Sequence, residues 1–561
     1  MTPRLTLVSI ALFLGLAPVA DRAKADSHRS LTIGITQFPA TMNPMIESML
    51  AKSYILAMVF RPFVTYDQRW KLVCMLCVRL PSVKNGQAEV VDLPGGKKGM
   101  RITWQIKEGV RWGDGAPVTV KDVQFAWKIG RHPKSGVANR EPYVRTVAIE
   151  RVDDRTFVQV IDKVRFDYQL LVPDPIPAHM EEKAFREPAE YKHRTLYDRD
   201  FAHPGLYNGP YRVANIVSGS HVELVRNQNW WGREPYFNRI IVRAIGNSAA
   251  LEANLQAGGI DYAAGELGLT PRQALGLKAR TRNKYTFIFK AGLIYEHADF
   301  NLDNPILKDR RVRRAMAYGL DRKQMSQALF RGLQPVADTA VSPLDPYAEK
   351  DVRRYPYDPR KAAALLDAAG WTLGDDGWRR DAKGRRLTLS LMTTADNRTR
   401  SLVSEIMQAY WRRIGIDVRL KLQPPRIFFG RTVSRRIYPG LAMYAWISAP
   451  GSTPRSSLHS SMVPNPANGW GGQNYPGFRN KEVDGLIESI ETELIPAKRR
   501  VLWKRLQQIY ADELPVLPLY FRANAYVIPR WLKGIRPTGH LAPSTLWIEE
   551  WHAVDEQAKA K

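Results

Sequence analysis

The stretch VRWGDGAPVTVKDVQFAW, residues 110–127, carries the densest local information about the fold. Its Gly-Asp-Gly sequence at 113–115 predicts a tight turn. Thr119 predicts the start of a helix, because Asp122 follows three residues later and can bond back to that start as a capping-box partner. The apolar residues that follow recur on one face of this helix, which we therefore expect to be buried against a core.

Strand signals lie on both sides of this stretch. Residues 101–106 alternate polar and apolar side chains, which is typical of a half-buried strand. Residues 147–161 predict a hairpin with two aspartates in its turn. Further strands are expected at 32–37, 221–225, 239–245, 416–422 and 516–521.

Helix signals are spread through the second half of the chain. Asp309 and Asp358 are candidate N-cap residues, and Pro359 occupies the first position of the second of these helices. A stripe of apolar residues from Leu402 to Ile414, spaced four apart, predicts another helix with that stripe facing inward. Residues 501–510 predict a helix before the last strand. Strands and helices alternate, so the sequence predicts an α/β protein.

Composition narrows the class of protein. The chain has 561 residues, enough for two to four domains, and its 15 Trp, 23 Tyr and 18 Phe argue against disorder. The net charge is +28, with 83 Lys and Arg against 55 Asp and Glu. The basic residues are scattered among acids and form no nucleic-acid motif, so we expect no nucleic-acid partner. The charge is interpreted as a solvated surface, attracted to an anionic membrane face.

The first 25 residues resemble an export signal. Arg4 precedes an apolar run from residue 5 to residue 20, which is short for a membrane span and contains Pro18. Small residues at 23 and 25 predict cleavage before Asp26. The alternative is an uncleaved N-terminal anchor. The region contributes +2, three basic residues against Asp21, so the mature chain keeps about +26. We expect a periplasmic protein.

No sequence motif indicates catalysis or metal binding. The chain has no phosphate-binding loop, no G-x-S-x-G elbow and no H-E-x-x-H, and its ten histidines are dispersed. Its only cysteines, Cys74 and Cys77, lie in the apolar segment LVCMLCV, where burial is favoured over a redox role; a local disulfide stays open. We expect no enzyme activity, no cofactor and no metal.

Six segments together resemble the bacterial extracellular solute-binding proteins of family 5, the oligopeptide and dipeptide type. They occur in the family's order and span nearly the whole mature chain. The segments are 110–127, 208–213 with 225–232, 309–322, 357–371, 409–418 and 513–520.

The resemblance implies a periplasmic-binding-protein fold of two α/β lobes joined by hinge crossovers, with an extra domain inserted in the first lobe. After the signal peptide at 1–25, residues 26–70, 207–290 and 518–555 would build the first lobe. Residues 71–206 would form the inserted domain and 291–517 the second lobe. The implied function is the solute-binding component of an ABC transporter. It would be a monomer, peripheral to the membrane, that captures a peptide or peptide-like solute between the lobes and delivers it to permease subunits.

The resemblance also places candidate ligand-binding residues. Trp446 matches the aromatic residue that faces the ligand, and Arg455 is a candidate partner for a ligand carboxylate. The Gly- and aromatic-rich segment 470–475 suits a loop over an extended peptide. The full candidate set is Gln37, Phe38, Met42, Asn43, Tyr295, Asn301, Trp446, Ser448, Arg455, Trp470, Asn474 and Tyr475.

One position departs from the family's pattern. Peptide binders of the family commonly carry an aspartate three residues after that tryptophan, where it holds the ligand's amine, and here the residue is Ala449. A non-peptide solute, such as a modified peptide or a conjugate, is therefore the alternative ligand. A secreted hydrolase is a minor alternative, because a catalytic triad ignores sequence order.

Overall fold

A sheet of ten strands runs through the part of the chain that the computed structural model describes, which comprises residues 29–46, 49–281, 283–395, 397–468, 470 and 472–554. The predicted signal peptide lies outside these residues. In spatial order the strands are β16 (Asp417–Gln423), β15 (Thr388–Thr394), β17 (Leu441–Ile447), β12 (Tyr285–Phe300), β18 (Val516–Pro529), β11 (Tyr262–Ala263), β1 (Ser30–Ile35), β10 (Arg239–Ala244), β9 (His221–Arg226) and β8 (Tyr211–Val217).

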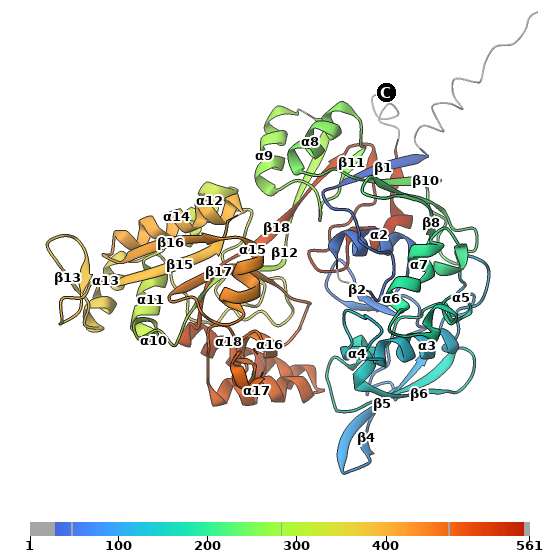
Figure 1. The fold of residues 1–561 in the computed structure, drawn as a ribbon, viewed down its shortest axis with the longest axis horizontal. Helices are drawn as coiled ribbons and strands as arrows, with labels where there is room; N and C mark the ends of the chain where they lie inside the picture. Colours follow the sequence, from blue (N-terminus) through green and yellow to red (C-terminus); the bar gives the residue numbers. More distant parts are fainter. Residues whose placement is uncertain are drawn as a thin grey trace, which may run out of the picture.

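The two long strands β12 and β18 connect the two halves of this sheet (Figure 1). Their antiparallel register runs from Tyr285 to Ala291, breaks, and resumes at Tyr295 opposite Phe521. Such a break weakens the ladder locally and lets the strands bend. We call the half with β1 and β8–β11 the first lobe and the half with β15–β17 the second lobe.

The core of the first lobe lies between its strands, α2 (Leu50–Val59) and the C-terminal segment η7 (Ser544–Glu550). Strand β1 pairs in parallel with β10 and β11 on its two edges, and its apolar residues Leu31, Ile33 and Ile35, which alternate onto one face, are buried in this core. Helices α8 (Ser248–Ala257) and α9 (Pro271–Arg280) enclose a second cluster beside the first part of β12.

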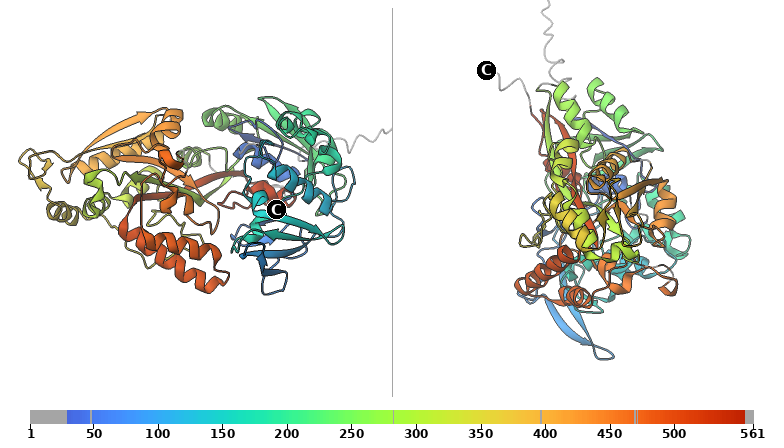
Figure 2. Two further views of the ribbon diagram at one scale, coloured as in Figure 1. Left: turned by 60° about the horizontal axis from the view of Figure 1, so that its bottom comes forward. Right: turned by 90° about the vertical axis from the view of Figure 1, so that its left-hand side faces the viewer.

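A separate sheet extends from the first lobe. Its antiparallel order is β4 (Ala88–Leu93), β5 (Lys97–Gln105), β7 (Thr156–Ile161) and β6 (Thr146–Arg151). Figure 2 shows its blue hairpin projecting from the rest of the molecule. Helix α3 (Val120–Arg131) covers it, and the Asp122 carboxylate accepts the Thr119 N–H at 2.9 Å, as the capping pattern predicts. The predicted strand at 101–106 and the predicted hairpin at 147–161 are confirmed. We call this part the insert.

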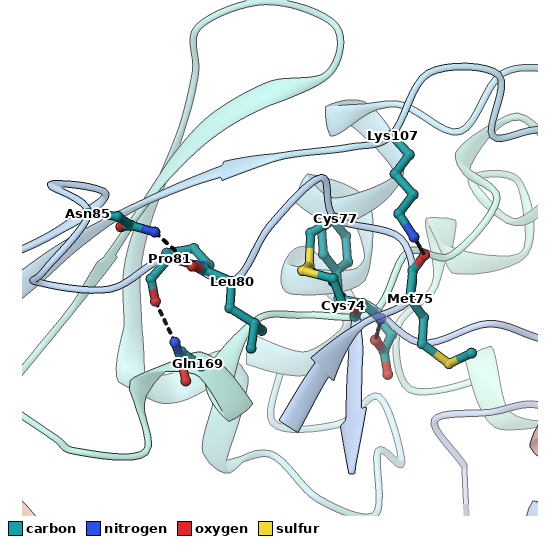
Figure 3. Close-up of a disulfide and its surroundings, with 10 residues drawn as sticks. Cys74, Met75, Cys77, Leu80, Pro81, Asn85, Lys107 and Gln169 are labelled. Carbon is teal, nitrogen blue, oxygen red and sulfur yellow. Dashed lines mark hydrogen bonds between the residues drawn. A yellow bond between two sulfur atoms is a disulfide. The ribbon is translucent and has the colours of Figure 1, made fainter. Parts of the chain in front are cut away.

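A disulfide joins Cys74 and Cys77 in the insert (Figure 3). Cys77 is fully buried, as the apolar context predicts, and Cys74 is half-buried at the end of β3 (Leu72–Cys74). The Lys107 ammonium donates to the Met75 carbonyl between the two cysteines at 2.9 Å. The sequence left a disulfide open, and the structure contains it.

The second lobe packs β15–β17 in one core with α10 (Pro305–Lys308), α11 (Arg310–Tyr318), α12 (Arg322–Phe330), α13 (Pro359–Ala368) and α14 (Arg398–Arg412). Two further helices, α17 (Lys481–Thr492) and α18 (Pro496–Glu513), pack against each other and the start of β18. Asp309 and Asp358 cap α11 and α13 as predicted. The predicted inward stripe of α14 is partly wrong: Leu402 and Ile406 are only half-buried. The face through Val403, Met407 and Trp411 is buried instead, because the helix is rotated toward β15 and β16.

The predicted residue boundaries of the three domains stay predictions. The described residues contain no helix that is long and apolar enough to cross a membrane.

Candidate functional site

A cavity lies on the second lobe beside the crossover strands and, counting the part that is open to solvent, spans about 1110 Å³. Its walls come from the second part of β12, the end of β17 with the loop that follows, residues 339–345, and α18. The lining combines aromatic rings with many hydroxyl groups, which suits a solute that has both apolar and hydrogen-bonding parts. These residues are Tyr295, Trp446, Trp503 and Tyr510 and, with hydroxyls, Thr339, Ser342, Ser448, Ser452, Thr453, Ser456 and Ser457.

The aromatic wall is held in place by ring contacts. Trp446 is half-buried at the end of β17, and its ring stacks on Tyr475 with centroids 5.8 Å apart. Tyr444 meets the same indole edge-to-face at 5.4 Å. Deeper in the cavity, the Tyr295 and Tyr510 hydroxyls form a 3.0 Å hydrogen bond. Fixed rings of this kind offer contact area at little conformational cost.

The ionisable side chains on the cavity wall, besides tyrosine, are His297, Asp299 and Asp345. Burial raises the pKa of Asp345, although its carboxylate accepts the backbone N–H groups of Gly451 and Tyr347 at 2.8 Å each. No lysine or arginine lines the cavity in the part of the chain that the structure describes.

A second buried carboxylate, Glu296, lies next to the cavity on β12 and is fully paired. It accepts Arg400 Nε at 2.6 Å and Arg522 Nε at 2.7 Å. Burial by itself would raise the pKa of Glu296, but the charges of Arg522 and Arg400 outweigh it and hold this pKa below its usual value. The triad ties β12 to β18 and α14 close to the register break.

A further cavity lies between the insert and the second lobe. Tyr66 and Phe166 line it from one side and Tyr347 and Arg499 from the other. The Phe166 N–H donates to the Glu491 carbonyl at 3.0 Å, and the Arg499 guanidinium lies 4.5 Å from the centre of the Phe166 ring. The insert and the second lobe therefore touch beside the first cavity.

The comparison with known families decides the class of protein. The model of the bacterial extracellular solute-binding proteins, family 5 (middle), matches residues 96–465, well over half of the chain. The chain belongs to this family. It is thus the solute-binding component of an ABC transporter, and the resemblance drawn from the six segments is confirmed.

Individual relatives and structures agree with this. Oligopeptide-binding protein AppA from Bacillus subtilis is 22% identical, over 97% of both chains. The nickel-binding periplasmic protein of Escherichia coli is 24% identical over 87% of this chain and 88% of its own. The crystal structure of the Thermus thermophilus oligopeptide-binding protein with a pentapeptide is 28% identical, with a TM-score of 0.71 over 96% of this chain and 98% of that one. The predicted two-lobed fold is confirmed.

Three of the residues predicted for the ligand site of this family 5 protein line the cavity. They are Tyr295, Trp446 and Ser448, and Ala449 lies on the wall beside them. Tyr475 does not line the cavity but supports Trp446 from behind. Their contact with a ligand stays a prediction.

The four candidates from the first lobe do not line the cavity. Asn43 is fully buried, and its amide donates to the Thr195 hydroxyl at 2.8 Å and the Tyr191 hydroxyl at 3.2 Å. Met42 is 2% exposed in the core of the first lobe, and Phe38 packs against that core. Gln37 is exposed.

The remaining candidates also lie off the cavity wall. Asn301 donates to the Tyr438 carbonyl at 2.6 Å, and the buried Asn474 amide donates to the backbone carbonyls of Leu458, His459 and Phe478. Arg455 forms a bidentate ion pair with Glu491, so its guanidinium already has a carboxylate partner. Trp470 lies near Arg435, whose guanidinium is 5.8 Å from the ring centre.

The sequence reasoning missed several wall residues, chiefly His297, Asp299, Asp345, Trp503 and Gln507. A signal existed for two of them. Tyr295, His297 and Asp299 are spaced by two along β12, so they point to the same face of the sheet. The other three come from a loop and from α18, and only the tertiary fold brings them to this wall.

Proposed function

We propose that the chain captures a peptide or a peptide-like solute in the cavity beside β12, β17 and α18 and delivers it unchanged to an ABC permease. The observation that carries this proposal is the position of the cavity. The cavity wall carries fixed aromatic rings and hydroxyl groups, and the cavity lies beside the strands that connect the lobes. Binding proteins of this architecture close by a hinge around their ligand.

The break in the β12–β18 register is the natural place for such a hinge. It lies between Ala291 and Tyr295, and Gly292 there approaches the Gly539 carbonyl so closely that a Cβ would lie 2.6 Å from it. Bending here would bring the first lobe over the open side of the cavity. Closure excludes water and so strengthens the polar contacts inside.

Export places this activity outside the cytoplasmic membrane. We propose that the signal at 1–25 is cleaved and that the mature protein works in the periplasm as a monomer. The surface charge of about +26 would hold it near anionic membrane lipids, where permease subunits lie. The closed, loaded form would then be the form that the permease recognises.

Two ligand classes remain in the proposal. Relatives of this chain include proteins named for oligopeptide, nickel and heme binding, so family membership alone does not choose between them. Ala449 on the cavity wall supplies no carboxylate for a peptide amine. This favours a peptide whose amine binds elsewhere, or a conjugate.

Native mass spectrometry of the full chain, purified without denaturation from a periplasmic extract, tests the proposal. We expect a bound small molecule that is released with unchanged mass and that rebinds to stripped protein. Rebinding at about 100 times the dissociation constant should stabilise the protein by roughly 2.7 kcal/mol. Release of a cleaved or modified product would refute the binding role and favour a hydrolase.

A further inference from the structure

A buried carboxylate faces a buried imidazole on the wall of the cavity. Asp299 and His297 both line it, and each is 1% exposed. The Tyr444 hydroxyl donates to Asp299 Oδ2, and Asp299 Oδ1 lies 3.3 Å from His297 Nε2. No lysine or arginine nitrogen lies within 4 Å of this carboxylate among the described residues. A buried negative charge is unfavourable unless a cation pairs with it.

The hydrogen bonds of His297 show that the pair of His297 and Asp299 lacks a hydrogen-bond donor. Its Nδ1 lies 3.1 Å from the Tyr295 carbonyl oxygen, which can only accept, so Nδ1 carries the proton. In neutral imidazole Nε2 is then an acceptor, and it has no hydrogen-bond partner in the described structure. With Nε2 unprotonated, it and Asp299 Oδ1 are two acceptors 3.3 Å apart with no hydrogen bond between them. A donor with positive charge would satisfy both.

The neighbouring Glu296 is a buried carboxylate that two arginines bind, from α14 and β18. Other buried carboxylates, Asp122 and Glu181, have no such cation but each accept at least two hydrogen bonds from neutral groups. Asp299, two strand positions past His297 on the cavity side, has neither: the Tyr444 hydroxyl is the one donor found for it among the described residues.

The rest of the cavity wall also carries negative rather than positive charge. Asp345 is the other carboxylate on its wall, although the whole chain carries a net charge of +28. The indole of Trp446, which stacks on Tyr475, also lines the cavity, and an indole ring attracts cations. An anionic solute would meet two carboxylates here, whereas a cationic one would meet complementary charge.

We propose that the ligand carries a protonated amine that binds between Asp299 Oδ1 and His297 Nε2. An ammonium group has three N–H donors, enough for both atoms. The indole N–H of Trp503, 2% exposed and without an acceptor among the described residues, lines the same cavity and suits a carbonyl of the same ligand. The ligand class is thus an amine that also bears an acyl or amide group. This inference rests on the proposed function of the cavity.

Three forms of one casein peptide digest test it on the full mature protein. The first form is unmodified, the second is dimethylated at its amines, which keeps the charge, and the third is acetylated, which removes it. Bound peptides are identified by mass spectrometry after gel filtration. We expect the unmodified form to be retained best. The dimethylated form should bind less well, because its ammonium keeps the charge but has only one N–H donor, and the acetylated form should bind at least 10-fold more weakly than the unmodified form. Retained peptides without lysine assign the amine to the peptide N-terminus, and retention confined to lysine-containing peptides assigns it to the side chain.

Asp299→Asn should weaken binding of the unmodified digest by roughly 10- to 100-fold, because it removes one charge-assisted hydrogen bond. Asp351→Asn is the matched control: this exposed aspartate pairs with Lys504 on the lobe surface, away from the cavity wall, and should bind as the wild type does. If Asp299→Asn does not fold, the comparison of charged and acetylated peptides in the wild type still decides.

Each outcome is decisive. Equal retention of charged and acetylated peptides would overturn the amine site and leave the binding function standing. Loss of binding in Asp345→Asn but not in Asp299→Asn would also overturn it, because Asp299 would then be dispensable for binding. Retention of no peptide in any form would instead count against the proposed peptide-binding function.

Discussion

Replacing Trp446 with alanine tests the aromatic wall of the cavity. The indole contacts two rings, Tyr475 and Tyr444, and such ring pairs are each worth about 0.5–1.5 kcal/mol. The variant should therefore lose about 1–3 kcal/mol of stability and still fold. A tryptophan at the centre of a binding site typically contributes about 2 kcal/mol or more to affinity, so we predict at least roughly 30-fold weaker binding.

The loss of affinity can be measured as a smaller stabilisation of the variant by the ligand. A ligand at about 100 times its dissociation constant stabilises the wild type by about 2.7 kcal/mol, and the same concentration should stabilise Trp446→Ala by only about 0.9 kcal/mol. The control is Trp378→Ala, since Trp378 contacts Arg412 and Arg386 near the hairpin of β13 (Thr372–Leu373) and β14 (Arg379–Arg380) and does not line the cavity. Undiminished stabilisation in Trp446→Ala would refute the assignment of this wall to the ligand.

Two further predictions concern stability. Glu296→Gln should cost about 3–5 kcal/mol at neutral pH in urea unfolding, because it leaves Arg400 and Arg522 without their buried carboxylate. Since the folded-state pKa of Glu296 is lowered, its charge stabilises the wild type above about pH 4.5 and this contribution is lost as the pH falls further; a cost that is the same at pH 3 and pH 7 would contradict the ion-pair account. Reduction of the Cys74–Cys77 disulfide should cost only about 2 kcal/mol, because the bond closes a very short loop. Unfolding of the insert by reductant alone, followed by circular dichroism, would show that the disulfide matters more than its loop length implies.

Local chemistry made much of the fold predictable. The capping pair Thr119 and Asp122 and the N-caps Asp309 and Asp358 depend on neighbours within four residues, and the structure has them as predicted. The rotation of α14 depends on what packs against it, so spacing alone chose Leu402 and Ile406 and missed the more deeply buried Val403 face. The two-lobed arrangement was predicted from the family resemblance, because no local sequence pattern indicates it.

The ligand site was harder to predict, because a polar residue in a loop can either bind a ligand or form hydrogen bonds that hold the protein's own structure. Asn43 and Asn474 looked available to a ligand, yet both are buried and satisfied by groups of the protein. Trp446 and Tyr295 were found through the family resemblance and not through a local pattern. His297 and Asp299 share the face of Tyr295 by strict alternation, and reading that alternation forward along β12 would have identified them.

Small-angle X-ray scattering tests most directly whether the two lobes close over a captured solute. The measurement compares the mature protein stripped of ligand with the same protein reloaded with the solute that it released. Bending at the break between Ala291 and Tyr295 predicts a smaller radius of gyration in the loaded form. An identical radius in the two forms, at a concentration where the solute is shown to be bound, would contradict capture between hinged lobes.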